Sequence, residues 1–335
     1  MPWRGIDDPY RIWLSEIILQ QTRIEQGRDY YRRFVETFPT VADLAAADEE
    51  AVLRLWQGLG YYTRARNLHA SARYIMESCG GTFPTTYEEI LKLKGVGRYT
   101  AAAIASFAYR LPYPVIDGNV YRFISRLRGI STPVATDAAY KEMEALLLHV
   151  IDRKRPDRFN AALMDFGSLQ CCPQPDCSVC PFADECVALR TGRVATLPVR
   201  IPKAKPKDRW FHYFDLRWRK DGIVYTLMQR RTGKDIWQGL WEFPLLETDH
   251  ELSADELTAE ALRFANKQFH LSTFHFHLSP PYRHQLTHRT VHALFLRAEL
   301  PSPPAVQPAN TGAVSLEGTK NTPLPRLIDR YLQSL

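Results

Sequence analysis

Five of the six cysteines are clustered in one short segment that could hold a metal. They are Cys171, Cys172, Cys177, Cys180 and Cys186. Thiolates so close together can surround one compact soft-metal centre, and cysteine-rich sites select zinc or an iron–sulfur cluster. Structural zinc sites usually pair two Cys-x2-Cys motifs, whereas this segment has one, in a loop stiffened by prolines. We therefore favour a four-iron cluster over zinc or buried free cysteines, in a reducing compartment.

Glu16 is a carboxyl group in a segment that suits acid catalysis. It lies in a helix predicted over residues 9–22, which Asp8 and Pro9 would begin as its cap and first residue. The segment is apolar on nearly every side, so the helix is expected to be buried. A carboxyl group in that setting should have a raised pKa and could act as a general acid near neutral pH. The alternative is a glutamate that points to solvent at the helix edge.

Asp117 follows an extended segment and precedes a predicted helix. Pro112 and Pro114 force the chain to be extended, and the next helix runs from near Gly118 until Gly129 stops it. Taken alone, Asp117 indicates the N-cap of that helix. A carboxylate that accepts helix N–H bonds also stays anionic beside a substrate, so Asp117 could stabilise a developing cation.

A Gly95-Val96-Gly97 turn precedes another predicted helix. Such a turn exposes backbone N–H groups at a helix N-terminus, which suits a phosphate. An ordinary helix–turn–helix corner is the alternative, but Leu91 before the turn and Ala101–Ala103 after it match a helix-hairpin-helix motif. That motif binds the DNA backbone and reads no base sequence.

A second glycine-rich turn, GLGYY at residues 58–62, presents aromatic side chains. A tyrosine such as Tyr61 on this turn can stack on bases or wedge between them, and ordinary core packing is the alternative. Arg64 and Arg66 follow the turn and could contribute to DNA affinity.

The chain divides into a helical part, a linker and a mixed part. Residues 1–192 repeat helical signals without a convincing alternating strand, which predicts an all-α domain. Residues 193–209 are rich in proline and basic residues and indicate a linker. Residues 210–335 predict an α+β domain. Its expected elements are a hairpin of strands 210–218 and 223–229, a helix at 254–268, and strands at 273–278 and 290–298.

The composition is that of a soluble globular protein of about two domains. The chain has 335 residues, 45% hydrophobic and 24% charged, which excludes a disordered or collagen-like chain. The 43 Lys and Arg residues exceed the 37 Asp and Glu residues, and almost all of this surplus lies in the linker. A basic surplus is a hint of a polyanionic partner. No apolar run is long enough to span a membrane and no signal peptide is evident, so we expect the cytosol.

Together these motifs resemble the helix-hairpin-helix DNA glycosylase superfamily that includes endonuclease III, and within it the adenine DNA glycosylase family. The resemblance covers nearly the whole chain. Its motifs lie at residues 13–22, 55–69, 93–101, 115–120, 171–186 and 237–244. It implies a monomer that binds double-stranded DNA containing A:8-oxoguanine or A:G mispairs, flips the adenine out and excises it in base excision repair. It also implies a [4Fe-4S] cluster.

The resemblance assigns catalytic roles to four residues. Glu16 would protonate the adenine N7 and later activate water, and Asp117 would stabilise the oxocarbenium ion through a covalent sugar adduct. Tyr99 and Asn119 would support that step. Bifunctional relatives carry a lysine at the position of Tyr99, where it forms a Schiff base and cleaves the strand. Because a tyrosine cannot do this, we predict a monofunctional glycosylase.

The resemblance also assigns residues to DNA and to the cluster. Gln21 and Tyr61 would wedge into the duplex around the lesion. The turn at Gly95 and Gly97, and Arg64, are the further DNA-binding candidates that the residues themselves indicate. The cluster ligands would be Cys171, Cys177, Cys180 and Cys186.

The C-terminal part resembles the Nudix-like domain that recognises 8-oxoguanine in this family. The family's Phe-Ser-His loop appears as Leu286-Thr287-His288, so Thr287 and His288 keep the hydroxyl and the imidazole. No Glu-rich catalytic box follows residues 241–244, and we expect no metal-dependent nucleotide hydrolysis. Four histidines at strand-like spacing could suggest a metal site, but ordinary surface or core positions are favoured. They are His275, His277, His284 and His292.

The sequence departs from the family at three points. It begins at the family's Pro-Trp-Arg segment, without the helix that normally precedes it. Five residues separate Cys171 from Cys177 where the family usually has six, so Cys172 is an alternative ligand, although Cys171 keeps the family's spacing from Asp165. Ala161 stands where relatives often carry Gln or Glu near the adenine pocket, which would weaken contacts to the base.

Overall fold

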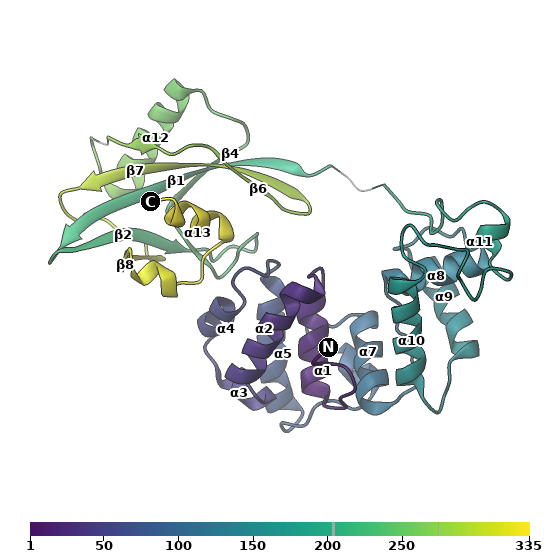
Figure 1. Cartoon of the computed structure of the whole chain (residues 1–335). Helices are drawn as coiled ribbons and strands as arrows, with labels where there is room; N and C mark the ends of the chain where they lie inside the picture. The colour runs from purple at the N-terminus through teal and green to yellow at the C-terminus, as the bar shows by residue number, and fades with distance from the viewer. Residues whose placement is uncertain (203–204, 274) are drawn as a thin grey trace. The chain divides into compact units, whose positions relative to one another are not determined.

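The computed structural model describes residues 1–202, 205–273 and 275–335 (Figure 1). The chain forms two compact units. One contains Met1–Ala47 and Asn67–Lys203, and the other contains Asp48–Arg66 and Ala204–Leu335. The first unit is helical and the second is mostly a β-sheet with helices. In the described part of the chain, no helix has both the length and the apolar character needed to cross a membrane.

The helical unit is made of short and medium helices joined by tight turns. They are α1 (Pro9–Leu19), α2 (Ile24–Thr37), α3 (Val41–Ala46), most of α5 (Thr63–Ser78), α6 (Tyr87–Leu91), α7 (Arg98–Tyr109), α8 (Gly118–Arg128), α9 (Asp137–Val150), α10 (Pro156–Leu169) and α11 (Val187–Arg190). α1 packs against α2 and α7, α7 packs against α6 and α10, and α8 packs against α10 and α11. These contacts bring α1, α7, α8 and α10 together around the candidate site.

Helix α1 begins where the sequence predicts and ends earlier. The Asp8 side chain accepts hydrogen bonds from the backbone N–H groups of Tyr10 and Arg11, and Pro9 occupies the first turn. The helix ends at Leu19 rather than at residue 22, because the backbone leaves the helical region and Gln21 adopts a left-handed conformation with φ of 55°. The prediction of a helix over residues 9–22 is therefore wrong by its last three residues.

The second unit contains α4 (Glu49–Leu55) and an eight-stranded sheet. The strands are β1 (Lys207–Lys220), β2 (Ile223–Arg230), β3 (Trp241–Glu242), β4 (Leu245–Thr248), β5 (His277–Leu278), β6 (Tyr282–Gln285), β7 (Arg289–Leu300) and β8 (Thr311–Ser315). The helices are α12 (Ala254–Phe269), a short 3-10 helix (Gly318–Asn321) and α13 (Arg326–Gln333). The main strand order is β3-β2-β1-β7-β5, with β1 and β7 parallel and the other pairs antiparallel.

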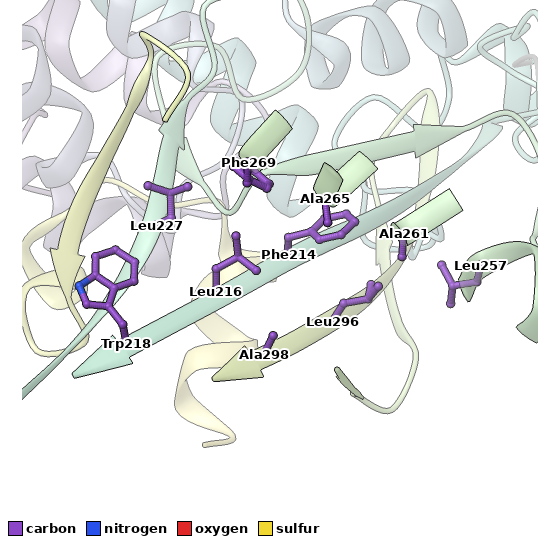
Figure 2. Packing of buried hydrophobic residues seen from close by; sticks show 10 residues of the cluster. All are labelled: Phe214, Leu216, Trp218, Leu227, Leu257, Ala261, Ala265, Phe269, Leu296 and Ala298. Carbon is purple, nitrogen blue, oxygen red and sulfur yellow. The ribbon is translucent and has the colours of Figure 1, made fainter. Parts of the chain in front are cut away.

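The predicted hairpin is present as β1 and β2. Trp218 lies opposite Tyr225, and the connecting residues Asp221 and Gly222 both have positive φ, as a tight two-residue hairpin turn requires. Phe214, one of the alternate residues of β1 that face helix α12, packs with Leu216, Trp218 and α12 residues such as Phe269 into one buried cluster (Figure 2).

Two other features of the mixed unit differ from the prediction. β1 begins at Lys207, inside the stretch 193–209 predicted as a linker. The strand predicted at 273–278 is reduced to His277–Leu278 among the residues that the structure describes there, and β6 and β8 were not anticipated. Short strands without alternating hydrophobicity leave little signal in a sequence.

The first part of the predicted linker is fixed to the helical unit. Leu197 is buried, and its carbonyl accepts a hydrogen bond of 3.1 Å from Nε of Arg126. The backbone N–H of Val134 donates to the carbonyl of Val199 at 2.9 Å. The residues up to Val199 therefore belong structurally to the helical unit.

Candidate active site

Glu16 lies on the buried face of α1, where the sequence predicts it. Its side chain is among the buried polar groups, at 9% exposure, and burial raises its pKa to about 7. A hydrogen bond from the Tyr99 hydroxyl and the positive charge of Arg4 act in the opposite direction, and the negative charge of Asp117 adds to the rise. A carboxyl group with a pKa near 7 can both donate and accept a proton at physiological pH.

Tyr99 lies at the start of α7 and is held in its protonated form. Burial first, and then the negative charges of Glu16 and Asp117, raise the pKa of its phenol well above the ordinary value. The hydroxyl therefore remains a hydrogen-bond donor to Glu16.

Asp117 is the N-cap of α8, as predicted. Its Oδ1 accepts hydrogen bonds from the backbone N–H of Asn119 at 2.9 Å and of Val120 at 2.7 Å. Its Oδ2 accepts from the side-chain amide of Asn119 at 2.8 Å. These bonds fix the orientation of the carboxylate, so its position is set before a substrate arrives.

Arg122 joins the Asp117 cap to the cysteine loop. Its guanidinium is buried and donates to the Oδ1 of Asn119 at 2.9 Å, to the carbonyl of Cys171 at 2.7 Å and to the carbonyl of Gly167. A Cβ on Gly167 would lie 2.6 Å from the carbonyl oxygen of Asn119, so only glycine allows this approach of α10 to α8. Arg122 belongs to no motif of its own, so its place in the site could not be predicted from the sequence.

A cavity of about 720 Å³ contains the four predicted catalytic residues, Glu16, Tyr99, Asp117 and Asn119. The N-terminal segment, α1, α7 and α10 also contribute to its wall. Arg4, which lines the cavity, pairs with Asp165 of α10 at 2.8 Å. Arg4 was not predicted as a site residue, because its only signal in the sequence is its place in the Pro-Trp-Arg segment.

The helix-hairpin-helix turn lies between α6 and α7. Gly95 has φ of +81°, and a Cβ there would lie 2.8 Å from the side chain of Asn67. Gly97 is the N-cap of α7 with φ of −96°, and a Cβ there would meet nothing within 4 Å. Gly95 is therefore required by the turn, whereas Gly97 leaves the surface at the helix start open.

Tyr61 and Thr287, two of the predicted DNA-binding residues, lie together in the second unit. Their hydroxyls form a hydrogen bond, and both line a cavity of about 400 Å³ that also contains His288. Tyr61 has positive φ and is exposed. Gln21 is also exposed and lies in the helical unit.

Arg64 holds the turn that carries Tyr61. Its Nη2 donates to the carbonyls of Leu59 and Gly60 at 3.2 Å, and its guanidinium lies over the rings of Trp56 and Tyr61. Burial lowers its pKa to about 10. Arg64 therefore supports the turn that carries Tyr61, and its contact with DNA stays a prediction.

Four of the clustered cysteines line one apolar cavity together with Phe123, Phe166 and Phe182. They are Cys171, Cys177, Cys180 and Cys186. The fifth, Cys172, is absent from this lining, and its thiol donates to the carbonyl of Gln174 at 3.1 Å. Arg126 lies beside the loop, with Nη1 at 3.5 Å from Sγ of Cys171 and 2.7 Å from the carbonyl of Cys172.

No three His, Cys, Asp or Glu side chains in the described residues are close enough to hold a single metal ion. This finding applies to the four histidines considered above as well as to the cysteines. A four-iron cube differs from a single ion, because each thiolate binds a separate iron and the sulfurs stand further apart. An apolar cavity with four thiols and one guanidinium donor fits the chemistry of such a cluster.

Comparisons with known proteins agree with this arrangement. Residues 14–151 match the family model of the HhH-GPD superfamily of base excision DNA repair proteins, and residues 216–334 match a NUDIX domain. The helical part is similar to a solved thermostable thymine-DNA glycosylase, with 28% identity and a TM-score of 0.54 over 57% of this chain and 88% of that one. It is also similar to an endonuclease III in a non-covalent DNA complex, with 25% identity and a TM-score of 0.50 over 55% and 85%. The fold and the site thus define a helix-hairpin-helix DNA glycosylase with a C-terminal Nudix-like domain, as predicted.

Relatives narrow the class to one family. An adenine DNA glycosylase of Buchnera aphidicola subsp. Baizongia pistaciae is 34% identical, with 73% of this chain and 68% of the relative covered. The adenine DNA glycosylase of Homo sapiens is 42% identical, with 79% of this chain and 58% of the relative covered. The chain therefore belongs to the adenine DNA glycosylase family, and it is an enzyme of base excision repair.

Proposed function

We propose that this chain is a monofunctional glycosylase that excises adenine paired with 8-oxoguanine or guanine in double-stranded DNA. The observation that carries the proposal is the pairing of a buried carboxyl group, Glu16, with a fixed carboxylate, Asp117, in one cavity. Hydrolysis of a glycosidic bond through an oxocarbenium-like transition state needs both, one as acid and one as anion.

Glu16 acts as the general acid in this proposal. Its pKa of about 7 keeps a substantial protonated fraction at neutral pH, so it can donate a proton to N7 of the flipped adenine. Protonation makes the base a better leaving group. After the base leaves, the same carboxylate accepts a proton from the attacking water.

Asp117 stabilises the positive charge that develops on the sugar. Its oxygens are held by the start of α8 and by the Asn119 amide, so no reorganisation is needed as the charge forms. A covalent adduct between this carboxylate and the sugar is the proposed intermediate. Tyr99 holds Glu16 by its hydrogen bond, and it has no amine to form a Schiff base.

The residues that recognise the oxidised base opposite the adenine are proposed to lie in the second unit. Tyr61, Thr287 and His288 line one cavity there, and their aromatic, hydroxyl and imidazole groups suit stacking and hydrogen bonding to an oxidised base. The helix-hairpin-helix turn at Gly95 and Gly97 is proposed to hold a phosphate, with Gln21 placed in the duplex.

Cys171, Cys177, Cys180 and Cys186 are proposed to hold a [4Fe-4S] cluster. When bound, the cluster would supply a rigid cross-link of the loop rather than chemistry on the base. Arg122 and Arg126 would hold the loop against α8 through the carbonyls of Cys171 and Cys172.

Single-turnover assays on duplexes with A:8-oxoguanine, A:G and A:C pairs, each followed by alkali, test the proposed reaction. The proposal predicts alkali-labile sites in the adenine strand for the first two duplexes, an uncut strand before alkali, and no robust protein–DNA adduct after borohydride. Lesion binding without excision, excision of a different base, or efficient borohydride trapping would contradict it.

A further inference from the structure

The segment Asp48–Arg66 belongs to the second unit, although its neighbours in the sequence belong to the helical unit. It contains helix α4, the glycine-rich turn that carries Tyr61, and the start of α5. Tyr61 is exposed and has φ of 48°, a left-handed conformation that residues other than glycine rarely adopt. Such a conformation persists only when the surrounding structure holds it.

Helix α4 is attached to residues 238–241, the loop that leads into β3. Nε1 of Trp241 donates a hydrogen bond to Oε1 of Glu50 at 2.6 Å. Gly239 has φ of 84°, and a Cβ on it would lie 3.2 Å from Cδ1 of Leu53. Glu50 and Leu53 are three residues apart in α4, so they lie on one face of the helix. This face of α4 therefore meets the loop.

The chain after the turn is attached to the same unit. The hydroxyl of Tyr62 donates a hydrogen bond to the carbonyl of Leu324 at 3.3 Å, and the guanidinium of Arg66 donates to the carbonyl of Gln238. Tyr61 thus lies between two anchored points of the chain, helix α4 before it and Tyr62 after it. These attachments fix both ends of the turn.

We propose that Trp241 is a positioning residue for the Tyr61 wedge. It holds α4 against the 238–241 loop, so the turn is ordered before DNA arrives. Tyr61 can then enter between bases beside the lesion without the entropy cost of ordering a free turn. The direct link is the hydrogen bond from the indole N–H to Glu50. This inference rests on the proposed recognition of 8-oxoguanine in this unit.

The test measures binding of the full-length, iron-loaded protein to a duplex with 8-oxoguanine opposite an adenine nucleotide that resists excision. The affinity is divided by that for an undamaged duplex of the same sequence. Trp241→Phe keeps an aromatic ring and removes the N–H donor. Glu50→Ala removes the acceptor, whereas Glu50→Gln keeps an acceptor oxygen. Trp210→Phe in β1, where the ring stacks on His292, is the matched control.

Trp241→Phe and Glu50→Ala should each lower the affinity ratio by about 3- to 10-fold, whereas Glu50→Gln and Trp210→Phe should keep it. With the first two variants, a 2-aminopurine base beside the 8-oxoguanine should also brighten less on binding, because it stays stacked. When Tyr61→Ala is already present, Trp241→Phe should cause no further loss, because it acts through the wedge.

An unchanged affinity ratio in Trp241→Phe and Glu50→Ala would overturn the inference and leave the proposed function intact, whether or not the melting temperature falls. The same conclusion follows if Tyr61→Ala alone keeps the ratio, or if Trp241→Phe causes an equal loss in the Tyr61→Ala protein. If the wild-type protein does not prefer the 8-oxoguanine duplex, the proposed recognition of the lesion itself fails and the inference fails with it.

Discussion

Replacing Glu16 by Gln should make the protein more stable at alkaline pH. Glu16 is buried, and its pKa rises from the ordinary 4.5 to about 7 chiefly because burial disfavours the charged form. Glutamine has nearly the same shape, and its carbonyl oxygen can still accept the hydrogen bond from Tyr99. The substitution therefore removes a buried charge while it keeps the packing of α1.

The size of the effect follows from the pKa of Glu16. Because this pKa is higher in the folded than in the unfolded chain, the folded state binds the proton more tightly, and low pH favours folding. This advantage is lost as the pH rises from about 4.5 through about 7. Above that range the buried carboxylate costs about 3 kcal/mol, and at pH 5 it costs less than about 1 kcal/mol.

Calorimetric unfolding of wild type and Glu16→Gln at pH 8 and pH 5 measures this difference and can separate the transitions of the two units. At pH 8 the melting temperature of the helical unit should rise by roughly 6–12 °C, and at pH 5 by only a small fraction of that. The control is Glu36→Gln, which removes an exposed glutamate of α2 and should change neither value.

A stability gain that is equal at the two pH values, or a loss of stability at pH 8, would contradict this prediction. Either would mean that Glu16 is not a buried carboxyl group with a raised pKa. It would also remove the reason for assigning the general acid to this residue.

Three further predictions follow from other parts of the site. Tyr99→Phe removes the hydrogen bond that lowers the pKa of Glu16, so this pKa should rise. The pH at which the single-turnover rate falls on the alkaline side should therefore increase by roughly 1 unit, and a decrease would contradict the prediction. Gly95→Ala should lower the free energy of unfolding by roughly 1–3 kcal/mol in urea titrations, because of its positive φ and crowded Cβ position, whereas Gly97→Ala should not. Cys171→Ser should purify with little iron and weak visible absorbance, whereas Cys172→Ser should keep both, and the reverse pattern would exchange the two assignments.

Local features of the fold could be predicted from the sequence. The cap at Asp117, the glycine that ends α8 and the hairpin turn at Asp221-Gly222 each depend on neighbouring residues only. The end of α1 was predicted wrongly because Gln20-Gln21-Thr22 carries no glycine or proline to mark it. The parallel pairing of β1 with β7 joins segments far apart in the chain, so no local pattern announces it.

The candidate site also contains residues that could be predicted from the sequence and residues that could not. Glu16 and Asp117 were predicted because their types and helical positions carry a chemical meaning. Arg122 was missed because its contacts depend on which groups of α10 and of the cysteine loop the fold brings near it. The hydrogen bonds of Arg64 to the backbone carbonyls of its own turn were not predicted for the same reason, because they depend on the folded shape of that turn.

In the proposed function, Glu16 is the acid that releases adenine. It is tested most directly by single-turnover excision at pH 7.5 from a duplex with adenine opposite 8-oxoguanine, with wild type and Glu16→Gln compared at equal iron content and equal DNA binding. We predict alkali-labile product with wild type and a rate lower by at least about 100-fold with the variant. Equal rates for the two proteins would contradict it.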